Sequence, residues 1–136
     1  MKTCPSCGQK LDKMEVVLRI CSVCSRELPQ PTASELEAEW FEGGELMMDA
    51  VHDVPETVWP AILKILEHEL TPDQIADLAA GPMEDLLAQH GARFIERVEA
   101  EAQRNPRLNH LLGGVWKSSM TEEIWERVQK ARKEVW

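Results

Sequence analysis

The chain has 136 residues, of which 43% are hydrophobic and 29% charged, as in folded globular proteins rather than disordered ones. Its net charge of −9 argues against nucleic-acid binding by the protein as a whole, because phosphate contacts need lysine and arginine. No apolar run approaches the roughly 20 residues that a membrane-spanning helix needs. No signal-peptide pattern follows the first residues. We therefore expect a cytoplasmic protein that makes no membrane contact.

The negative charge is concentrated in the middle of the chain. Residues 31–85 contain fourteen acidic residues and one basic residue, Lys64, whereas residues 1–30 and 86–136 each carry a net charge of +2. Like charges at this density destabilise a fold by repulsion, but they attract a cationic partner. The pattern predicts either a face that binds a basic protein or an acidic surface that only aids solubility.

Four cysteines form two Cys-x-x-Cys pairs near the N-terminus, Cys4 with Cys7 and Cys21 with Cys24. The cytosol keeps thiols reduced, which disfavours disulfides. A two-residue gap lets both thiolates of a pair reach one ion, and two pairs complete a tetrahedral four-sulfur site with no open position. Gly8 can supply the positive φ that such a turn often needs. We predict one structural Zn²⁺, whose binding folds this segment; iron or redox-active cysteines are the alternatives.

The cysteine pattern of residues 1–26 resembles the zinc ribbon family. This resemblance implies a small β module, and the β-branched-rich run Met14–Ile20 suits one of its strands. Zinc ribbons serve nucleic acids, protein partners and stability alike. Residues 1–30 include five basic residues but no aromatic side chain for base stacking, so nucleic-acid binding through the ribbon is the less favoured role. Pro29 and Pro31 mark an extended linker at 29–33, after a ribbon domain at 1–28.

Helical signals fill the chain after the linker. Ser34 and Glu37 have capping-box spacing and predict a helix that ends at the glycine pair 43–44. Two further helices are expected at about 45–53 and 55–69. Pro60 is expected to kink the second of these helices or to mark its true start.

Pairs of a capping residue and a proline divide the second half of the chain. Thr71–Pro72 opens a helix that Gly81 is expected to end, and Pro82 opens another that ends near Gly91. The remaining helices are expected at 92–104, from Pro106 to the glycine pair 113–114, and from Thr121 onward. The prediction is a mainly α protein: a small N-terminal β zinc ribbon, then an all-α acidic domain at 34–136. About eight short helices would form an orthogonal bundle or a short α-solenoid.

Two stretches of the helical domain are distinctive, GPMEDLLAQHG at 81–91 and LGGVW at 112–116. Together they resemble an uncharacterised family of small bacterial all-helical domains, over roughly residues 40–130. The resemblance implies an all-α bacterial domain. Members of that family often look like immunity-type or other accessory proteins, which implies a binding role rather than catalysis.

Five acidic residues are candidates for contact with a basic partner: Glu45, Asp49, Asp53, Glu84 and Asp85. For the last two, capping of the positive end of a helix is the favoured explanation, and contact with a partner is the alternative. Asp49 and His52 have the i, i+3 spacing of helical metal sites, but no second pair of this kind is present.

We expect a non-enzymatic binding or accessory protein, an immunity-type or inhibitor module that docks a basic protein partner. One alternative is a regulatory, nucleic-acid-associated protein that binds through the ribbon. Another is an enzyme whose scattered active site brings His52 or His90 together with carboxylates.

Overall fold

The computed structural model describes residues 3–4, 7–10, 12 and 30–136. The chain divides into two compact units, Met1–Thr32 and Ala33–Trp136. In the first unit, Thr3 and Lys10 form an antiparallel β-bridge. The predicted strand Met14–Ile20 and the first linker residue lie outside the described residues.

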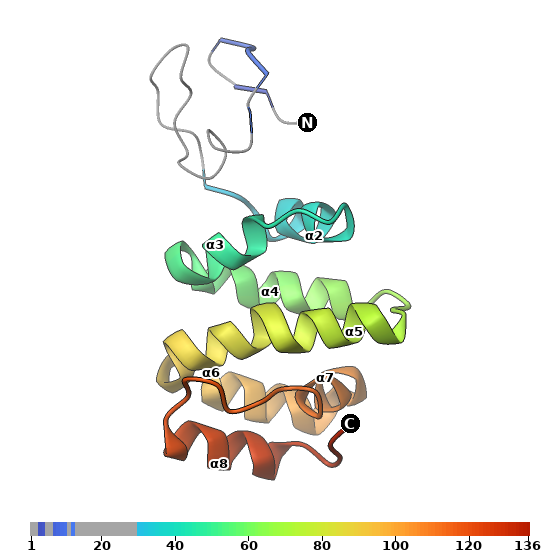
Figure 1. The fold of residues 1–136 in the computed structure, drawn as a ribbon, viewed down its shortest axis with the longest axis vertical. Coiled ribbons are helices and arrows are strands. Elements are labelled where there is room, and N and C mark those ends of the chain that lie inside the picture. Colours follow the sequence, from blue (N-terminus) through green and yellow to red (C-terminus); the bar gives the residue numbers. More distant parts are fainter. Residues whose placement is uncertain (1–2, 5–6, 11, 13–29) are drawn as a thin grey trace. The chain divides into compact units, whose positions relative to one another are not determined.

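The second unit is built from packed helices. Its elements are α2 (Ala33–Phe41), α3 (Leu46–Asp53), α4 (Pro55–Leu66), α5 (Pro72–Leu78), the π-helix η1 (Ala79–Met83), α6 (Glu84–Arg104), α7 (Pro106–Leu112) and α8 (Glu122–Ala131). Figure 1 shows them as stacked layers: α2 with α3, then α4, then α5 leading into α6, then the rest of α6 with α7, and then α8. The most extensive helix–helix contacts pair α2 with α4 and α6 with α8. The predicted mainly helical fold is confirmed for this unit.

Capping residues set several helix ends where the sequence predicts them. Thr71 caps α5 with a complete capping box: its Oγ1 accepts from Gln74 N at 3.2 Å, and Gln74 Oε1 accepts from Thr71 N at 2.9 Å. Asn105 and Thr121 cap α7 and α8 through their side-chain oxygens. Gly43 follows α2 with φ +81°, a conformation that favours glycine.

The prediction that Gly81 ends one helix and Pro82 begins another is wrong. The helix continues from α5 through η1 into α6. A proline inside an α-helix removes one hydrogen bond and crowds the carbonyl four residues earlier. The wider π-turn accommodates that ring, so the chain passes Pro82 without stopping.

The predicted helix boundary near Gly91 is confirmed as a kink. Helix α6 leaves helical geometry at His90, where φ is −132° and ψ is 27°, so two helical segments meet there. A Cβ atom on Gly91 would lie 2.9 Å from Cγ1 of Ile124, so the missing side chain lets α6 and α8 approach closely. Gly91 therefore lies next to the break that the sequence predicts, and it also permits a close approach of two helices that the sequence alone does not reveal.

Two smaller boundaries also differ from the prediction. Helix α2 begins at Ala33, which places Ser34 inside its first turn, and α4 ends at Leu66 rather than near residue 69. Pro60 lies inside α4, which continues past it.

The core of the second unit runs through every layer of the stack. Its largest fully buried side chains are Phe94, Leu36, Ile62, Ile65, Leu78, Met83, Leu86, Leu87, Ile95, Leu108, Leu111 and Leu112. Trp59 on α4 is buried, whereas Trp125 on α8 is half-buried. In the part of the chain that the structure describes, no helix is both long and apolar enough to cross a bilayer.

Candidate functional site

The first Cys-x-x-Cys pair forms a tight turn. Gly8 N donates to the carbonyl of Cys4 at 2.8 Å, and Cys4 N donates to the carbonyl of Gln9 at 2.8 Å. Gly8 has φ +75°, which confirms the positive φ that the motif predicts. Cys4 is buried and Cys7 is exposed. The second pair lies outside the described residues, so the four-cysteine zinc site stays a prediction.

Helix α3 is amphipathic and presents three of the predicted contact residues on one face. Its buried residues are Leu46, Met47, Ala50 and Val51. The intervening positions form what we call the outer face of α3, made of Glu45, Met48, Asp49, His52 and Asp53. Met48 is 40% exposed on this face. The carboxylates of Asp49 and Asp53 make no ion pair or hydrogen bond with any described residue.

Glu84 and Asp85 lie on a different element, the first turn of α6, and both are half-buried. Burial raises the pKa of both carboxyl groups. The neighbouring Asp85 charge raises the pKa of Glu84 further, and a hydrogen bond from Ser118 lowers it. Met83 before them is helical, so no helix end is present for them to cap. The helix-capping interpretation of these two residues is therefore wrong.

Part of the acidic segment is used within the fold. Glu39 Oε1 accepts a hydrogen bond from Leu46 N at 2.8 Å, which joins α2 to the start of α3. Glu56 accepts from Arg93 Nε at 2.8 Å and from Arg97 Nη1 at 2.6 Å, which joins α4 to α6. The bond from Arg97 lowers the pKa of Glu56. The charge available to a partner is thus smaller than the segment's net charge.

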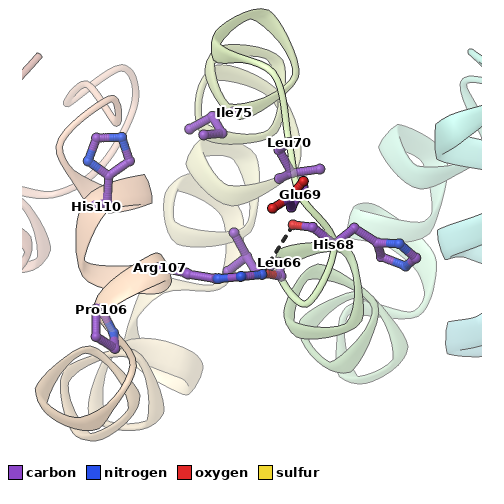
Figure 2. A pocket seen from close by; sticks show the side chains of 8 residues that line it. All are labelled: Leu66, His68, Glu69, Leu70, Ile75, Pro106, Arg107 and His110. Atoms are coloured by element: carbon purple, nitrogen blue, oxygen red, sulfur yellow. Dashed lines mark hydrogen bonds between the residues drawn. The ribbon is translucent and has the colours of Figure 1, made fainter.

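A pocket of about 480 Å³ lies between the α4–α5 connection and α7 (Figure 2). Its apolar lining comes from Leu66, Leu70, Ile75 and Pro106. Its ionisable lining comes from His68, Glu69, Arg107 and His110. The volume falls within the range of roughly 300–1,000 Å³ that is usual for small-molecule sites.

Arg107 is held in place across this pocket. Its Nη1 donates to the carbonyl of Leu66 at 2.7 Å and to that of His68 at 3.2 Å. These carbonyls lie at the C-terminal end of α4, where no further turn of helix is present to satisfy them. Figure 2 shows the side chain reaching from α7 to the α4–α5 connection. Its Nε and Nη2 groups have no acceptor among the described residues.

His68 connects the rim of the pocket to α2. Its Nε2 lies 2.9 Å from Glu37 Oε2, and its ring meets that of Phe41 edge-on at 4.7 Å between centroids. Phe41 is 38% exposed. The contacts fix His68 at the edge of the pocket.

His110 has a similar environment on α7. Its Nδ1 lies 3.2 Å from Glu134 Oε1, and its ring stacks on that of Trp136 at 5.2 Å. Trp136 Nε1 donates to the carbonyl of His110 at 2.6 Å, and Trp136 N donates to the carbonyl of Gly113 at 3.1 Å. The C-terminal tail therefore packs back on α7.

The profile of a family of unknown function, DUF6869, matches residues 29–135. The chain belongs to this family. The match covers the helical domain, which confirms the resemblance to an uncharacterised helical family that residues 81–91 and 112–116 indicated. It does not extend over the cysteine pairs. No curated protein and no solved structure matches the chain.

The pocket of this DUF6869 member was not predicted from the sequence. Its residues come from 66–75 and 106–110, two short segments that share no motif. The one available signal was Arg107, a basic residue directly after the capping pair Asn105–Pro106, which can reach the carbonyls of another helix.

Neither His52 nor His90 makes a hydrogen bond or an ion pair with a carboxylate in the part of the chain that the structure describes. His90 Nε2 donates to the carbonyl of Val51 at 2.9 Å, and His52 lies on the exposed outer face of α3. Within residues 30–136 and the few described positions before them, no group of three His, Cys, Asp or Glu side chains is placed to hold a metal ion.

Proposed function

We propose that this DUF6869 member is a non-enzymatic protein-binding module that docks a basic partner, in the manner of an immunity-type or inhibitor protein. The observation that supports the proposal is the outer face of α3. Met48 stands exposed on it beside Asp49 and Asp53, whose carboxylates have no partner among the described residues. Other acidic residues, such as Glu56, are already paired with arginines of the fold.

An apolar contact surrounded by charge is the usual arrangement of a protein interface. The apolar centre loses water on binding, and the charged rim selects and orients the partner. The outer face of α3 fits a partner surface on which lysines or arginines surround an apolar hollow. Carboxylates that are not engaged within the fold can meet such cations without breaking an existing ion pair.

We also propose that the N-terminal segment, residues 1–28, is a zinc ribbon. In this proposal Cys4, Cys7, Cys21 and Cys24 hold one Zn²⁺ that has a structural role, in a cytoplasm that keeps the thiols reduced. The turn at Gly8 supports it. The stacked helices of the second unit would then serve as a short α-solenoid that carries the docking face.

The test is affinity capture from the native host with three forms of the full chain. The first is the wild type, and the second carries Glu45→Gln, Asp49→Asn and Asp53→Asn. The third carries Glu96→Gln, Glu123→Gln and Glu126→Gln, which makes the same change in net charge on α6 and α8.

We expect the wild type and the α6–α8 variant to recover the same basic protein, with recovery that falls as salt rises. The α3 variant should lose it. Recovery of only neutral or acidic partners, insensitive to salt, would exclude the proposal. So would equal loss in both variants, because net charge rather than the outer face of α3 would then be responsible.

A further inference from the structure

We propose that the pocket between the α4–α5 connection and α7 binds a free apolar α-amino acid, with Arg107 holding its carboxylate and Glu69 its ammonium group. The inference concerns a site separate from the outer face of α3. It rests on two opposite charges without ion pairs, placed together on an apolar hollow.

The anion-binding half is the outer edge of the Arg107 guanidinium. Because Nη1 is committed to the carbonyls of Leu66 and His68, the group cannot swing freely. The edge formed by Nε and Nη2 is left without an acceptor among the described residues. Two parallel N–H donors on one edge of a guanidinium match the two oxygens of a carboxylate. Arg107 is therefore a pre-oriented carboxylate binder.

The cation-binding half is Glu69. It is exposed on the α4–α5 connection and lines the same pocket, and its side chain makes no ion pair or hydrogen bond within the described part of the chain. Figure 2 shows its carboxylate on the pocket side of the connection. A simple organic acid would leave Glu69 unpaired beside another anion. A zwitterion satisfies both charges, and an apolar α-amino acid is a zwitterion with an apolar side chain.

The residues that line the pocket indicate the third feature of the ligand, an apolar side chain. Leu66, Leu70 and Ile75 line the hollow beside the two charges, and Pro106 closes it on the side of α7. A branched aliphatic side chain placed there is removed from water, which favours binding, whereas glycine has no side chain to bury against these residues. The site therefore favours leucine-like amino acids over small or charged ones.

Four probes separate the three parts of the proposal by calorimetry or by ligand-observed NMR with the full chain. L-leucine carries all three features. Glycine lacks the apolar side chain, 4-methylpentanoate lacks the ammonium group, and 3-methylbutylamine lacks the carboxylate. We expect saturable binding of leucine and an affinity about tenfold or more lower for each of the others, as the loss of one charge-assisted contact or of the apolar contact predicts.

Glu69→Gln is the decisive variant, because Glu69 has no bond in the fold that the change could break. It should weaken leucine binding about tenfold and leave 4-methylpentanoate binding equal or stronger, because the change removes a negative charge beside this anion. Glu67→Gln, an exposed neighbour that does not line the pocket, should change neither. Absence of saturable leucine binding at millimolar concentration would overturn the proposal, as would unchanged leucine affinity in Glu69→Gln.

The proposal of protein docking on α3 and the proposal of amino-acid binding in the pocket can be refuted independently of each other. The variant neutralised on the outer face of α3 should bind leucine as the wild type does, whether or not it captures a partner. Loss of leucine binding in that variant would contradict the assignment of the ligand to this pocket.

Discussion

A Cβ atom added to Gly91 would lie 2.9 Å from Cγ1 and 3.0 Å from Cγ2 of Ile124. Both residues are buried, Gly91 on α6 and Ile124 on α8. Cβ atoms in folded proteins essentially never come this close to another heavy atom. The separation of the last two layers of the stack therefore depends on glycine at position 91.

We predict that Gly91→Ala lowers the free energy of unfolding by about 1–3 kcal/mol, the usual cost of overpacking a core. Chemical denaturation followed by circular dichroism measures it. Gly81→Ala is the matched control, because its new Cβ would meet only Met48 Sδ at 3.6 Å, an ordinary contact. The control should be neutral or slightly stabilising, since alanine favours helix. A Gly91→Ala protein as stable as the control would contradict the packing argument.

A second prediction concerns Asn109, the one buried polar residue noted among the described positions. Its Nδ2 donates to the carbonyls of Ala102 at 3.2 Å and Ala131 at 3.0 Å, and its Oδ1 accepts from Lys133 N at 2.9 Å. Asn109→Leu should lower the free energy of unfolding by about 1–3 kcal/mol, because these backbone groups lose their partner.

Asn109→Asp should be more harmful above the carboxyl pKa, since a carboxylate cannot donate to carbonyl oxygens. The control is Gln103→Ala on the exposed side of α6. Equal stability of Asn109→Asp and wild type near neutral pH would show that the amide does not bridge these helices.

A third prediction follows from the raised pKa of Asp85. Burial disfavours its charged form in the folded protein, so the folded state takes up a proton at higher pH than the unfolded state does. Above the folded pKa the charge opposes folding, and this penalty disappears as pH falls toward the ordinary value of 3.8. Asp85→Asn should therefore be more stable than wild type at neutral pH.

The difference in stability should vanish below the ordinary carboxyl pKa, where both side chains are neutral. Thermal unfolding at a series of pH values tests this. Asp77→Asn on the exposed side of α5 serves as the control, since it removes an equal charge without a buried setting. A variant less stable than wild type at neutral pH would show that the charge contributes favourably.

A fourth prediction concerns metal removal. We expect one Zn²⁺ per chain by native mass spectrometry, lost with a strong chelator or by Cys4→Ser. Because residues 33–136 form a compact unit of their own, their unfolding transition should not move when the metal is lost. A metal-free chain with unchanged N-terminal NMR signals would refute the structural role of zinc. A shifted helical transition would instead show that the two units stabilise each other.

The sequence predicts those features that depend only on residues adjacent in the chain. The capping residues Thr71, Asn105 and Thr121 act as their sequence pattern indicates, because a cap requires only the next few backbone N–H groups. Gly8 likewise adopts the positive φ that its motif requires.

The features that the sequence does not predict depend on contacts between residues that are far apart in the chain. The sequence predicts the break near Gly91 but not the packing role of this glycine, because nothing near it in the sequence reveals Ile124 on the facing helix. The sequence does not predict the pocket for the same reason, since Arg107 meets the carbonyl of Leu66 across 41 positions of sequence. The sequence favours caps at Glu84 and Asp85, because a proline before two acids is the usual start of a helix, whereas the helix continues through η1 past these residues.

The π-helix η1 also sets the rotational phase between the helices that it joins. Six buried residues repeat every four positions through this region: Leu78, Ala79, Pro82, Met83, Leu86 and Leu87. In a regular α-helix such a repeat rotates by about 40° at each step. The wider turn takes up part of that rotation and keeps the apolar stripe aligned on one side. Deleting a single residue from 79–83 would rotate α6 about its axis and move its buried residues away from their present neighbours. Residues 79–83 should therefore tolerate substitutions better than insertions or deletions.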